Sequence, residues 1–280
     1  MSTNRKVWNI VVRSLIWLCV VATVALLVGL IGYIMVRGLP YVTWELLTTQ
    51  RSALKDTIGI LPNIIFTLYL ILTTLLIAMP IGIGGAIYLT EYAKNQKLVS
   101  FIEFATETLT GIPSIIYGLV GMMVFVQGMK MGSGILAGSL TLSIMILPNI
   151  LRTTQEALKT VPQSYREGSV GLGATKWHTI RTIVLPCTLD GVVGGAILAI
   201  GKIVGESAAL LYTAGAGYKL VTNYFQALHT SSGSLSVMLY VYFQEQGKID
   251  LGFAIAAILM IIVLVINGCA KLAKKKLKRV

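Results

Sequence analysis

The segment of residues 160–186, TVPQSYREGSVGLGATKWHTIRTIVLP, contains the pattern from which the rest of the fold is inferred. Pro162 favours a helix start, because proline is well tolerated in a first turn, and Ser164 is a candidate N-cap. Glu167 would then lie in the first turn, where the helix dipole stabilises an acidic side chain. The sequence therefore predicts a short helix soon after Pro162.

Two glycines would end this helix and allow a second one to follow. Gly173 is a better candidate than Gly171 for the left-handed residue that caps a helix. A second helix is predicted from about Thr175, and Leu185-Pro186 would break it. Its apolar side chains recur at i, i+3 and i+7, at Trp177, Ile180 and Val184. This helix–turn–helix is too short to be stable alone, so another surface must cover it.

Long apolar runs fill most of the remaining chain. Hydrophobic residues make up 55% of the sequence and charged residues 12%, against about 25% charged in soluble domains. Runs of about 20 residues cross a bilayer as helices, and these runs lack the period of two that a barrel requires. An all-α integral membrane protein with six spans is predicted, at Leu15–Val36, Leu61–Ala86, Leu109–Val126, Ile135–Leu151, Gly191–Ala214 and Leu251–Cys269.

Lysine and arginine are unevenly distributed between the connecting segments. Sixteen lie at the N-terminus, in the second-to-third and fourth-to-fifth connections and at the C-terminus, against six on the opposite side. The positive-inside rule therefore predicts that both termini and residues 160–186 are cytoplasmic, and this requires an even number of spans. The basic run 271–280 is interpreted as an anchor at the anionic inner leaflet.

The charge pattern argues against other classes of protein. No soluble stretch is long enough for a nucleic-acid-binding domain, and no acidic or thiol cluster accompanies His178 or His229, so no metal site is expected. The external segment Gly215–Asp250 has two interpretations. Residues Ser234–Gln244 form either a helix lying in the outer interface or a lid packed over the bundle.

Two ionisable residues, Lys202 and Glu206, stand inside the fifth span, four positions apart and on one helical face. Placing either at the bilayer centre costs about 2.5–3.5 kcal/mol. They would either satisfy only each other or face a polar pathway in which Lys202 attracts an anion and Glu206 positions it. Small residues favour the bundle interior because they let helices approach closely, and they stand at Gly191, Gly194, Gly195, Gly201 and Gly205.

The first segment also resembles the EAA loop of ABC importer permeases, E-A-A-x3-G-x9-I-x-L-P. Glu167, Gly173 and Ile183–Pro186 fall at the required spacing, while Gly168 and Ser169 replace the two alanines. In that family the loop is a coupling helix that sits in a groove of the ATP-binding subunit. The resemblance implies a type I ABC importer permease fold, and an ATPase-coupling role for Glu167, Gly168, Ser169, Gly171, Gly173, Leu185 and Pro186.

A second resemblance concerns the substrate. Residues 201–214 look like the R-x-x-G-E-T-A-P-L-L segment of phosphate ABC permeases, and residues 86–93 and 110–118 look like further stretches of that family. Length and the short first loop favour the PstA half over its partner PstC. Lys202 stands where arginine is usual, so bidentate phosphate recognition is lost. Ala209 replaces the usual proline, which puts the expected kink in doubt.

The resemblance implies a permease subunit that imports inorganic phosphate across a bacterial or archaeal cytoplasmic membrane. Its partners would be a PstC-like permease, a PstB-like ATPase dimer, a PstS-like extracytoplasmic phosphate-binding protein and the lipid bilayer. The permease core is expected at 61–270, after an N-terminal tail, first helix and external loop at 1–60 and before the basic tail at 271–280. The implied substrate pathway contains Lys202, Glu206, Ser207 and Ser114.

The chain has no G-x-x-x-x-G-K-[ST] motif, so it is expected to be neither an enzyme nor a cofactor-binding subunit. ATP and Mg would be used by the partner ATPase. Three alternatives remain. A permease for molybdate or sulfate would keep the same loop. A secondary transporter would need an inverted repeat, and none is clear. A membrane scaffold or sensor would not need Lys202 and Glu206. Residues 111–114 also have a second interpretation, as a simple helix kink.

Overall fold

The computed structural model describes residues 3–52, 57–221 and 223–277. Lys55 and the last three residues of the expected basic tail lie outside that range. Helices dominate, as predicted; η1 is a 3₁₀ turn and the other η elements are π-helical turns. In chain order the elements are α1 (Thr3–Gly38), η1 (Leu39–Tyr41), α2 (Trp44–Thr48), β1 (Gln50–Ser52), β2 (Thr57–Ile60), α3 (Leu61–Ile87), η2 (Tyr88–Tyr92), α4 (Gln96–Thr110), α5 (Ser114–Gly121), η3 (Met122–Gly128), α6 (Ile135–Lys159), α7 (Gln163–Gly171), α8 (Lys176–Thr179), η4 (Ile180–Val184), α9 (Leu185–Gly205), α10 (Ala208–Thr213), α11 (Tyr224–Ala227), α12 (Leu235–Tyr240), η5 (Val241–Glu245) and α13 (Ile249–Leu277).

Apolar helices long enough to cross a membrane confirm the predicted class of fold. Within the described residues, five continuous helical stretches qualify by length and composition, and one bent pair raises the number to six. The five stretches are Trp8–Tyr41, Leu61–Tyr92, Ile135–Lys159, Lys176–Gly205 and Ile249–Leu272.

The predicted third span at Leu109–Val126 is interrupted near its start. The chain turns by 100° between α4 and α5, so residues 111–114 form a bend. Pro113 has no N–H and disfavours a helical conformation at Ile112. The Tyr117 hydroxyl donates a hydrogen bond to the Leu109 carbonyl across the bend, at 2.7 Å.

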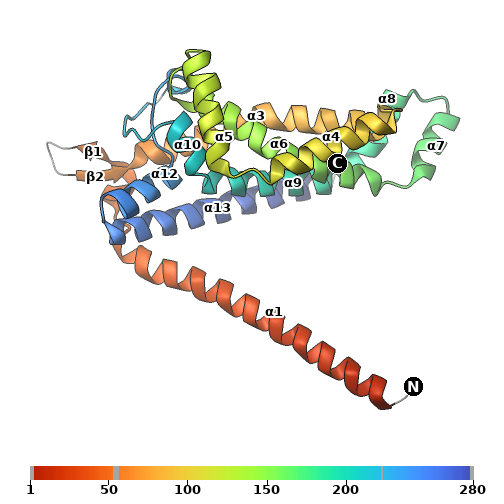
Figure 1. Ribbon diagram of the computed structural model, residues 1–280, viewed down its shortest axis with the longest axis horizontal. Coiled ribbons are helices and arrows are strands. Elements are labelled where there is room, and N and C mark those ends of the chain that lie inside the picture. Colours follow the sequence, from red (N-terminus) through yellow and green to blue (C-terminus); the bar gives the residue numbers. More distant parts are fainter. Residues whose placement is uncertain (1–2, 53–56, 222, 278–280) are drawn as a thin grey trace.

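The core of the bundle is formed by α3, α6 and α9, which lie side by side in Figure 1. Small residues bring the last two together, because a Cβ added at Gly191 would lie 2.3 Å from the Ala157 Cβ, and one at Gly195 would lie 2.4 Å from the Thr153 hydroxyl. Gly194, Gly201 and Gly205 face open space instead. The predicted role of glycine in close helix packing therefore holds for Gly191 and Gly195 but not for the other three glycines.

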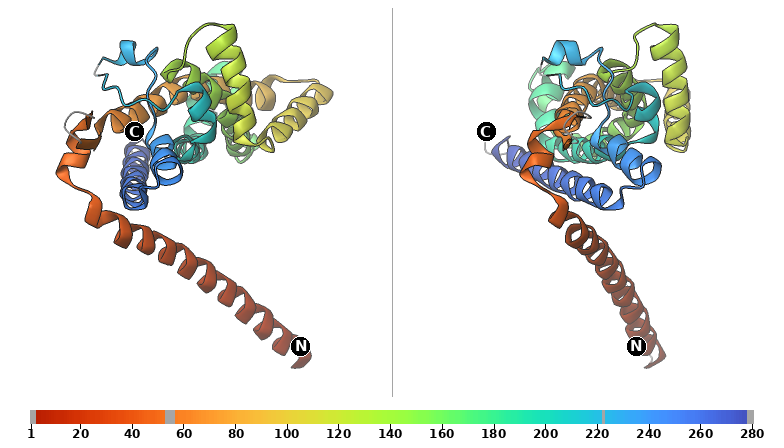
Figure 2. Two further views of the ribbon diagram at one scale, coloured as in Figure 1. Left: turned by 60° about the vertical axis from the view of Figure 1, so that its left-hand side comes forward. Right: turned by 90° about the vertical axis from the view of Figure 1, so that its left-hand side faces the viewer.

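The C-terminal end of helix α1 adjoins the bundle, and the rest of α1 extends away from the bundle in every view (Figures 1 and 2). None of the side chains in its most apolar stretch is buried. Contact is made near Gly38, where an added Cβ would collide with the Phe253 carbonyl, and where the Tyr33 and Phe253 rings lie 5.6 Å apart. The apolar surface of α1 thus requires lipid or another subunit to cover it.

The segment from Gly215 to Asp250, which is predicted to be external, packs onto the bundle, as the lid interpretation predicts. Leu235, Val237 and Tyr242 are fully buried. The Asn63 amide of α3 donates a hydrogen bond to the Gly233 carbonyl at 2.7 Å. The alternative, a helix lying separately in the outer interface, does not describe this arrangement. At the same end β1 and β2 pair antiparallel, with Gln50 opposite Ile60.

Candidate functional site: the α7–α8 hairpin and the broken fifth helix

The two short helices α7 and α8 form the predicted hairpin. Pro162 itself is the N-cap of α7, without a side-chain bond, so the assignment of Ser164 as N-cap was wrong. Glu167 consequently lies beyond the first turn, not within it. Proline's ring fixes its φ at about −65° but leaves ψ free, so Pro162, at φ −57° and ψ 141°, takes the cap position and the helix starts at the next residue.

The turn between the helices follows the prediction. Gly173 has φ +86°, the left-handed conformation that only glycine adopts readily. Its N–H donates to the Val170 carbonyl at 2.9 Å, and the Ala174 N–H donates to the Ser169 carbonyl at 3.1 Å. These two bonds satisfy carbonyls that the end of α7 would leave unpaired.

The helix is not interrupted at Pro186, so the helix break predicted at Leu185-Pro186 was wrong. Thr175 caps α8 by accepting the His178 N–H, and the helix then continues from Lys176 to Gly205. The π-helical turn η4 immediately precedes Leu185-Pro186. A π-helical turn changes the hydrogen-bond register, so the helix accommodates a residue without an N–H.

The hairpin presents an uncovered apolar face. Leu172, at its tip, is 92% exposed, and Tyr165, Val170 and Trp177 are more than half exposed. Buried Ser169 and Thr179 share a hydrogen bond of 2.8 Å between their hydroxyls, which holds α7 against α8. The result is a preformed hairpin whose exposed apolar side chains are left uncovered by the part of the chain that the structure describes.

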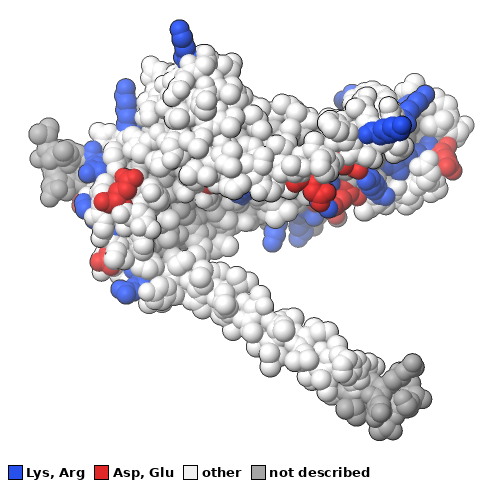
Figure 3. Space-filling model, in the orientation of Figure 1, with Lys and Arg blue, Asp and Glu red and all other residues white. Residues whose placement is uncertain are grey.

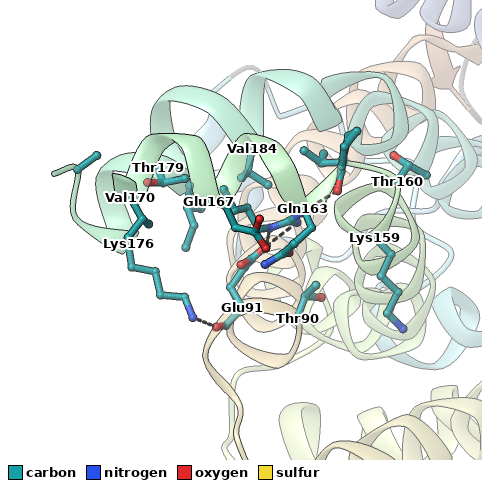
Figure 4. A pocket seen from close by; sticks show the side chains of 15 residues that line it. Thr90, Glu91, Lys159, Thr160, Gln163, Glu167, Val170, Lys176, Thr179 and Val184 are labelled. Carbon is teal, nitrogen blue, oxygen red and sulfur yellow. Dashed lines mark hydrogen bonds and ion pairs between the residues drawn. The ribbon is translucent and has the colours of Figure 1, made fainter. Parts of the chain in front are cut away.

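A cavity of about 1020 Å³ lies between the hairpin and the ends of α3 and α6. Figure 4 shows Lys176 extended to Glu91 and dashed contacts meeting at Glu91. Arg166 pairs with Glu91 at 2.8 Å. Glu91 lies in the family-like stretch 86–93, but sequence reasoning missed its pairing with Arg166, because the two residues are 75 positions apart and no local pattern indicates such a pair.

The fifth span contains a break that the sequence prediction did not include. Helix α9 ends at Gly205, and Glu206 has extended backbone angles of φ −79° and ψ 121°. Its carboxylate accepts the Ala209 N–H at 3.0 Å, at the start of α10. Lys202 and Glu206 therefore do not share a helical face, and within the described residues they form no ion pair.

The other two residues predicted to line the pathway lie at the starts of neighbouring helices. Ser114 starts α5, and Ser207 directly precedes α10. These helices touch where a Cβ added at Gly118 would lie 2.7 Å from the Ala209 Cα. Ala209 thus fits a close helix contact, and the chain bends here without the proline usual in the resembled family. Ser207 lines a cavity of about 390 Å³ that Ser236 also lines.

A second group of charges lies between α4 and α6, in a region we call the α4–α6 patch, defined by Glu103, Glu107, Arg152, Glu156 and Lys159. Arg152 lies 3.3 Å from Glu156 and 3.9 Å from Glu107, and Lys159 lies 3.7 Å from Glu103. These side chains are largely exposed. In Figure 3 the middle of the bundle is mostly white and charges gather toward its ends.

Comparison with known proteins identifies the class to which this fold and hairpin belong. Residues 78–279 match the family described as binding-protein-dependent transport system inner membrane component. The match covers most of the chain, so the protein belongs to this family. It is a multi-pass, inner-membrane permease subunit of an ABC importer.

Individual relatives add detail. The chain is 37% identical to a probable ABC transporter permease, YqgI, of Bacillus subtilis, over 76% of this chain and 72% of that protein. It is 30% identical to the phosphate transport system permease PstA of Pasteurella multocida, over 96% and 95% of the two chains.

Solved structures share the fold at lower identity. A bacterial alginate ABC transporter bound to its periplasmic protein superposes with a TM-score of 0.64 at 16% identity, covering 98% of this chain and 96% of that one. The methionine ABC transporter MetNI gives 0.58 at 20% identity, covering 78% and 94%. The type I ABC importer permease fold predicted from the EAA-like loop is thereby confirmed.

Proposed function

We propose that this chain is one of two transmembrane subunits of an ATP-driven importer of inorganic phosphate. The similarity to a phosphate permease over nearly the whole chain carries this proposal. The stretch at 201–214, which resembles the R-x-x-G-E-T-A-P-L-L segment of phosphate permeases, supports the same substrate.

The proposed complex contains a PstC-like second permease, a PstB-like ATPase dimer and a PstS-like phosphate-binding protein outside the membrane. A PstC protein of Haemophilus influenzae is itself 30% identical to this chain. ATP and Mg act in the ATPase subunits. Both termini and the hairpin face the cytoplasm, a placement supported by Figure 1, in which α1 begins and α13 ends toward the side that carries α7.

In this proposal the α7–α8 hairpin is the coupling element. Its exposed apolar face is the surface that an ATPase groove would cover, and its residues are those of the EAA-like segment. Closure of the ATPases upon ATP binding would displace the hairpin. The helices would then open to one side of the membrane and close to the other.

Lys202 supplies the positive charge for the anion. It is partly buried and unpaired within the described chain, so its charge remains available for a transient oxyanion contact. Glu206 acts indirectly, since its carboxylate fixes the start of α10. The Ser207 and Ser114 hydroxyls would offer hydrogen bonds from neighbouring helices.

Vesicles containing this chain with its permease, ATPase and receptor partners test the proposal. We expect phosphate uptake that requires ATP and is blocked by vanadate. Uptake of phosphate without ATP would favour a secondary transporter and contradict the proposal.

A permease for another oxyanion is the second candidate, favoured by one observation. Lysine at position 202 lacks the planar fork that recognises two phosphate oxygens at once. Binding of molybdate or sulfate, but not phosphate, by the cognate receptor would select this candidate.

Lys202→Ala tests the substrate pathway. We expect phosphate uptake to fall by at least about tenfold, because one charge-assisted contact is lost, while the complex still assembles. Lys202→Arg is the matched control and should retain uptake. Unchanged uptake in Lys202→Ala would exclude the proposed role.

A further inference from the structure

The far end of α3 is held by both helices of the hairpin. From α7, the Arg166 guanidinium donates to one Glu91 carboxylate oxygen through Nε at 3.0 Å and through Nη2 at 2.8 Å. The same guanidinium donates to the carbonyls of Leu158 and Val161 at 2.9 and 2.7 Å, where α6 ends. One planar side chain therefore joins α7 to the ends of both α3 and α6.

From α8, Lys176 reaches the same turn of α3. Its ammonium group donates to the Glu91 backbone carbonyl and lies 5.0 Å from the centre of the Tyr92 ring. These contacts meet at η2, the π-helical turn that ends α3 (Figure 4). We call the set Glu91, Arg166 and Lys176 the η2 clasp.

The central pair of the η2 clasp is shielded from water. The Arg166 and Glu91 side chains are 16% and 8% exposed, whereas every paired side chain of the α4–α6 patch is at least 44% exposed. Separating a buried ion pair leaves an uncompensated charge, which is strongly unfavourable. Such a pair therefore holds the two helix ends that carry it in one relative position. Arginine also offers a rigid fork that lysine cannot reproduce.

The covalent connections of the hairpin reach only two of the three core helices. Residues 160–162 join α7 to α6, and α8 continues through η4 into α9. Helix α3 packs in the same core but is remote from the hairpin in sequence. A displacement of the hairpin therefore reaches α3 through non-covalent contacts, which are those at η2 and the packing of α3 against α6 and α9.

We infer that the η2 clasp transmits displacement of the α7–α8 hairpin to α3, so that α3 moves together with α6 and α9. This inference rests on the proposed function of the hairpin as a coupling element. Glu91 is a positioning residue that acts through Arg166, and neither residue touches substrate in this role. The clasp would make three helices respond to a single docking event.

The full complex in lipid vesicles tests the inference, with hydrogen exchange measured in the presence and absence of ATP and vanadate. In the wild type, residues 61–92 and 163–171 should both change their exchange upon nucleotide trapping. In Glu91→Ala, residues 163–171 should still respond while residues 61–92 should not. Phosphate taken up per ATP hydrolysed should fall on the order of tenfold.

Three further variants sharpen the test. Arg166→Lys keeps the charge but not the fork and should also lose the α3 response, whereas Glu156→Gln, in the exposed patch, should keep it. Glu91→Gln keeps an oxygen acceptor and should retain part of the α3 response. If Glu91→Ala does not assemble with the ATPase, Glu91→Gln is the variant to compare with the wild type.

Two outcomes separate the inference from the proposed function. A normal α3 response in both Glu91→Ala and Arg166→Lys would overturn the η2 clasp. A wild-type complex that shows the α3 response but takes up no phosphate would overturn the proposed substrate and support the clasp.

Discussion

The η2 clasp and the α4–α6 patch use the same residue types in neighbouring places, and Lys159 lines the cavities beside both. In the clasp, Arg166 and Glu91 are nearly enclosed, and further N–H groups of Arg166 donate to the backbone carbonyls of Leu158 and Val161. In the patch, the charged groups stay in contact with solvent, where ion pairs contribute about 0–1 kcal/mol. The two groups of charges differ in burial more than in number. We expect a buried ion pair to hold helices together and an exposed one to be replaceable at little cost in stability.

The largest expected effect follows from Arg166→Ala. Removing the guanidinium leaves Glu91 buried without its partner, and such a loss costs about 3–5 kcal/mol. The midpoint of SDS-induced unfolding in mixed micelles should fall accordingly. A shift no larger than that of an exposed-pair variant would show that the clasp is not energetically distinct.

A smaller effect is expected from Gly173→Ala. The residue has φ +86°, where an L side chain costs about 1–2 kcal/mol. Gly171→Ala is the matched control, because an added Cβ meets nothing at either position and only the backbone conformation differs. Equal unfolding midpoints for the two variants would contradict this explanation.

Ser169→Ala should cost about 1 kcal/mol, since it removes the buried hydroxyl bond between α7 and α8. Hydrogen exchange at residues 163–171 should become faster. Exposed Ser164→Ala serves as the comparison and should leave exchange unchanged. Because alanine favours helix more than serine does, faster exchange in both variants would show that loss of the Ser169–Thr179 bond is not the cause.

The smallest effect is expected from Glu107→Gln in the α4–α6 patch. Its carboxylate lies 3.9 Å from Arg152, with both side chains mostly exposed. The free energy of unfolding should therefore change by less than about 1 kcal/mol, with little shift in the unfolding midpoint. High salt should abolish any difference. A large, salt-independent decrease in the unfolding midpoint would show that Glu107 stabilises the fold as the clasp residues do.

Local signals in the sequence were sufficient for some of these features. Apolar length predicted the spanning helices, and the glycine spacing predicted the left-handed cap at Gly173. The helix start at Pro162 and the apolar spacing after Thr175 predicted the hairpin, and the EAA-like spacing predicted the permease fold. Each of these depends on residues close together in the chain.

Features that depend on distant partners were missed. Glu206 leaves the helix in an arrangement where Ser236, 30 positions later, donates to its backbone carbonyl. The Glu91–Arg166 pair joins residues 75 positions apart. Pro186 stays within a helix because η4 precedes it, and a π-helical turn has no simple sequence signature. The substrate roles of Lys202, Glu206, Ser207 and Ser114 remain predictions, because they depend on a ligand and on facing subunits.

The isolation of α1 has a consequence for how the chain matures. Membrane proteins form first by insertion of individual helices and then by association of those helices within the lipid. The most apolar stretch of α1 buries no side chain against its own chain, so along that stretch α1 completes insertion without joining the association step. Substitutions along its bare surface should therefore alter integration into the membrane or pairing with another subunit, while the remaining helices assemble as before.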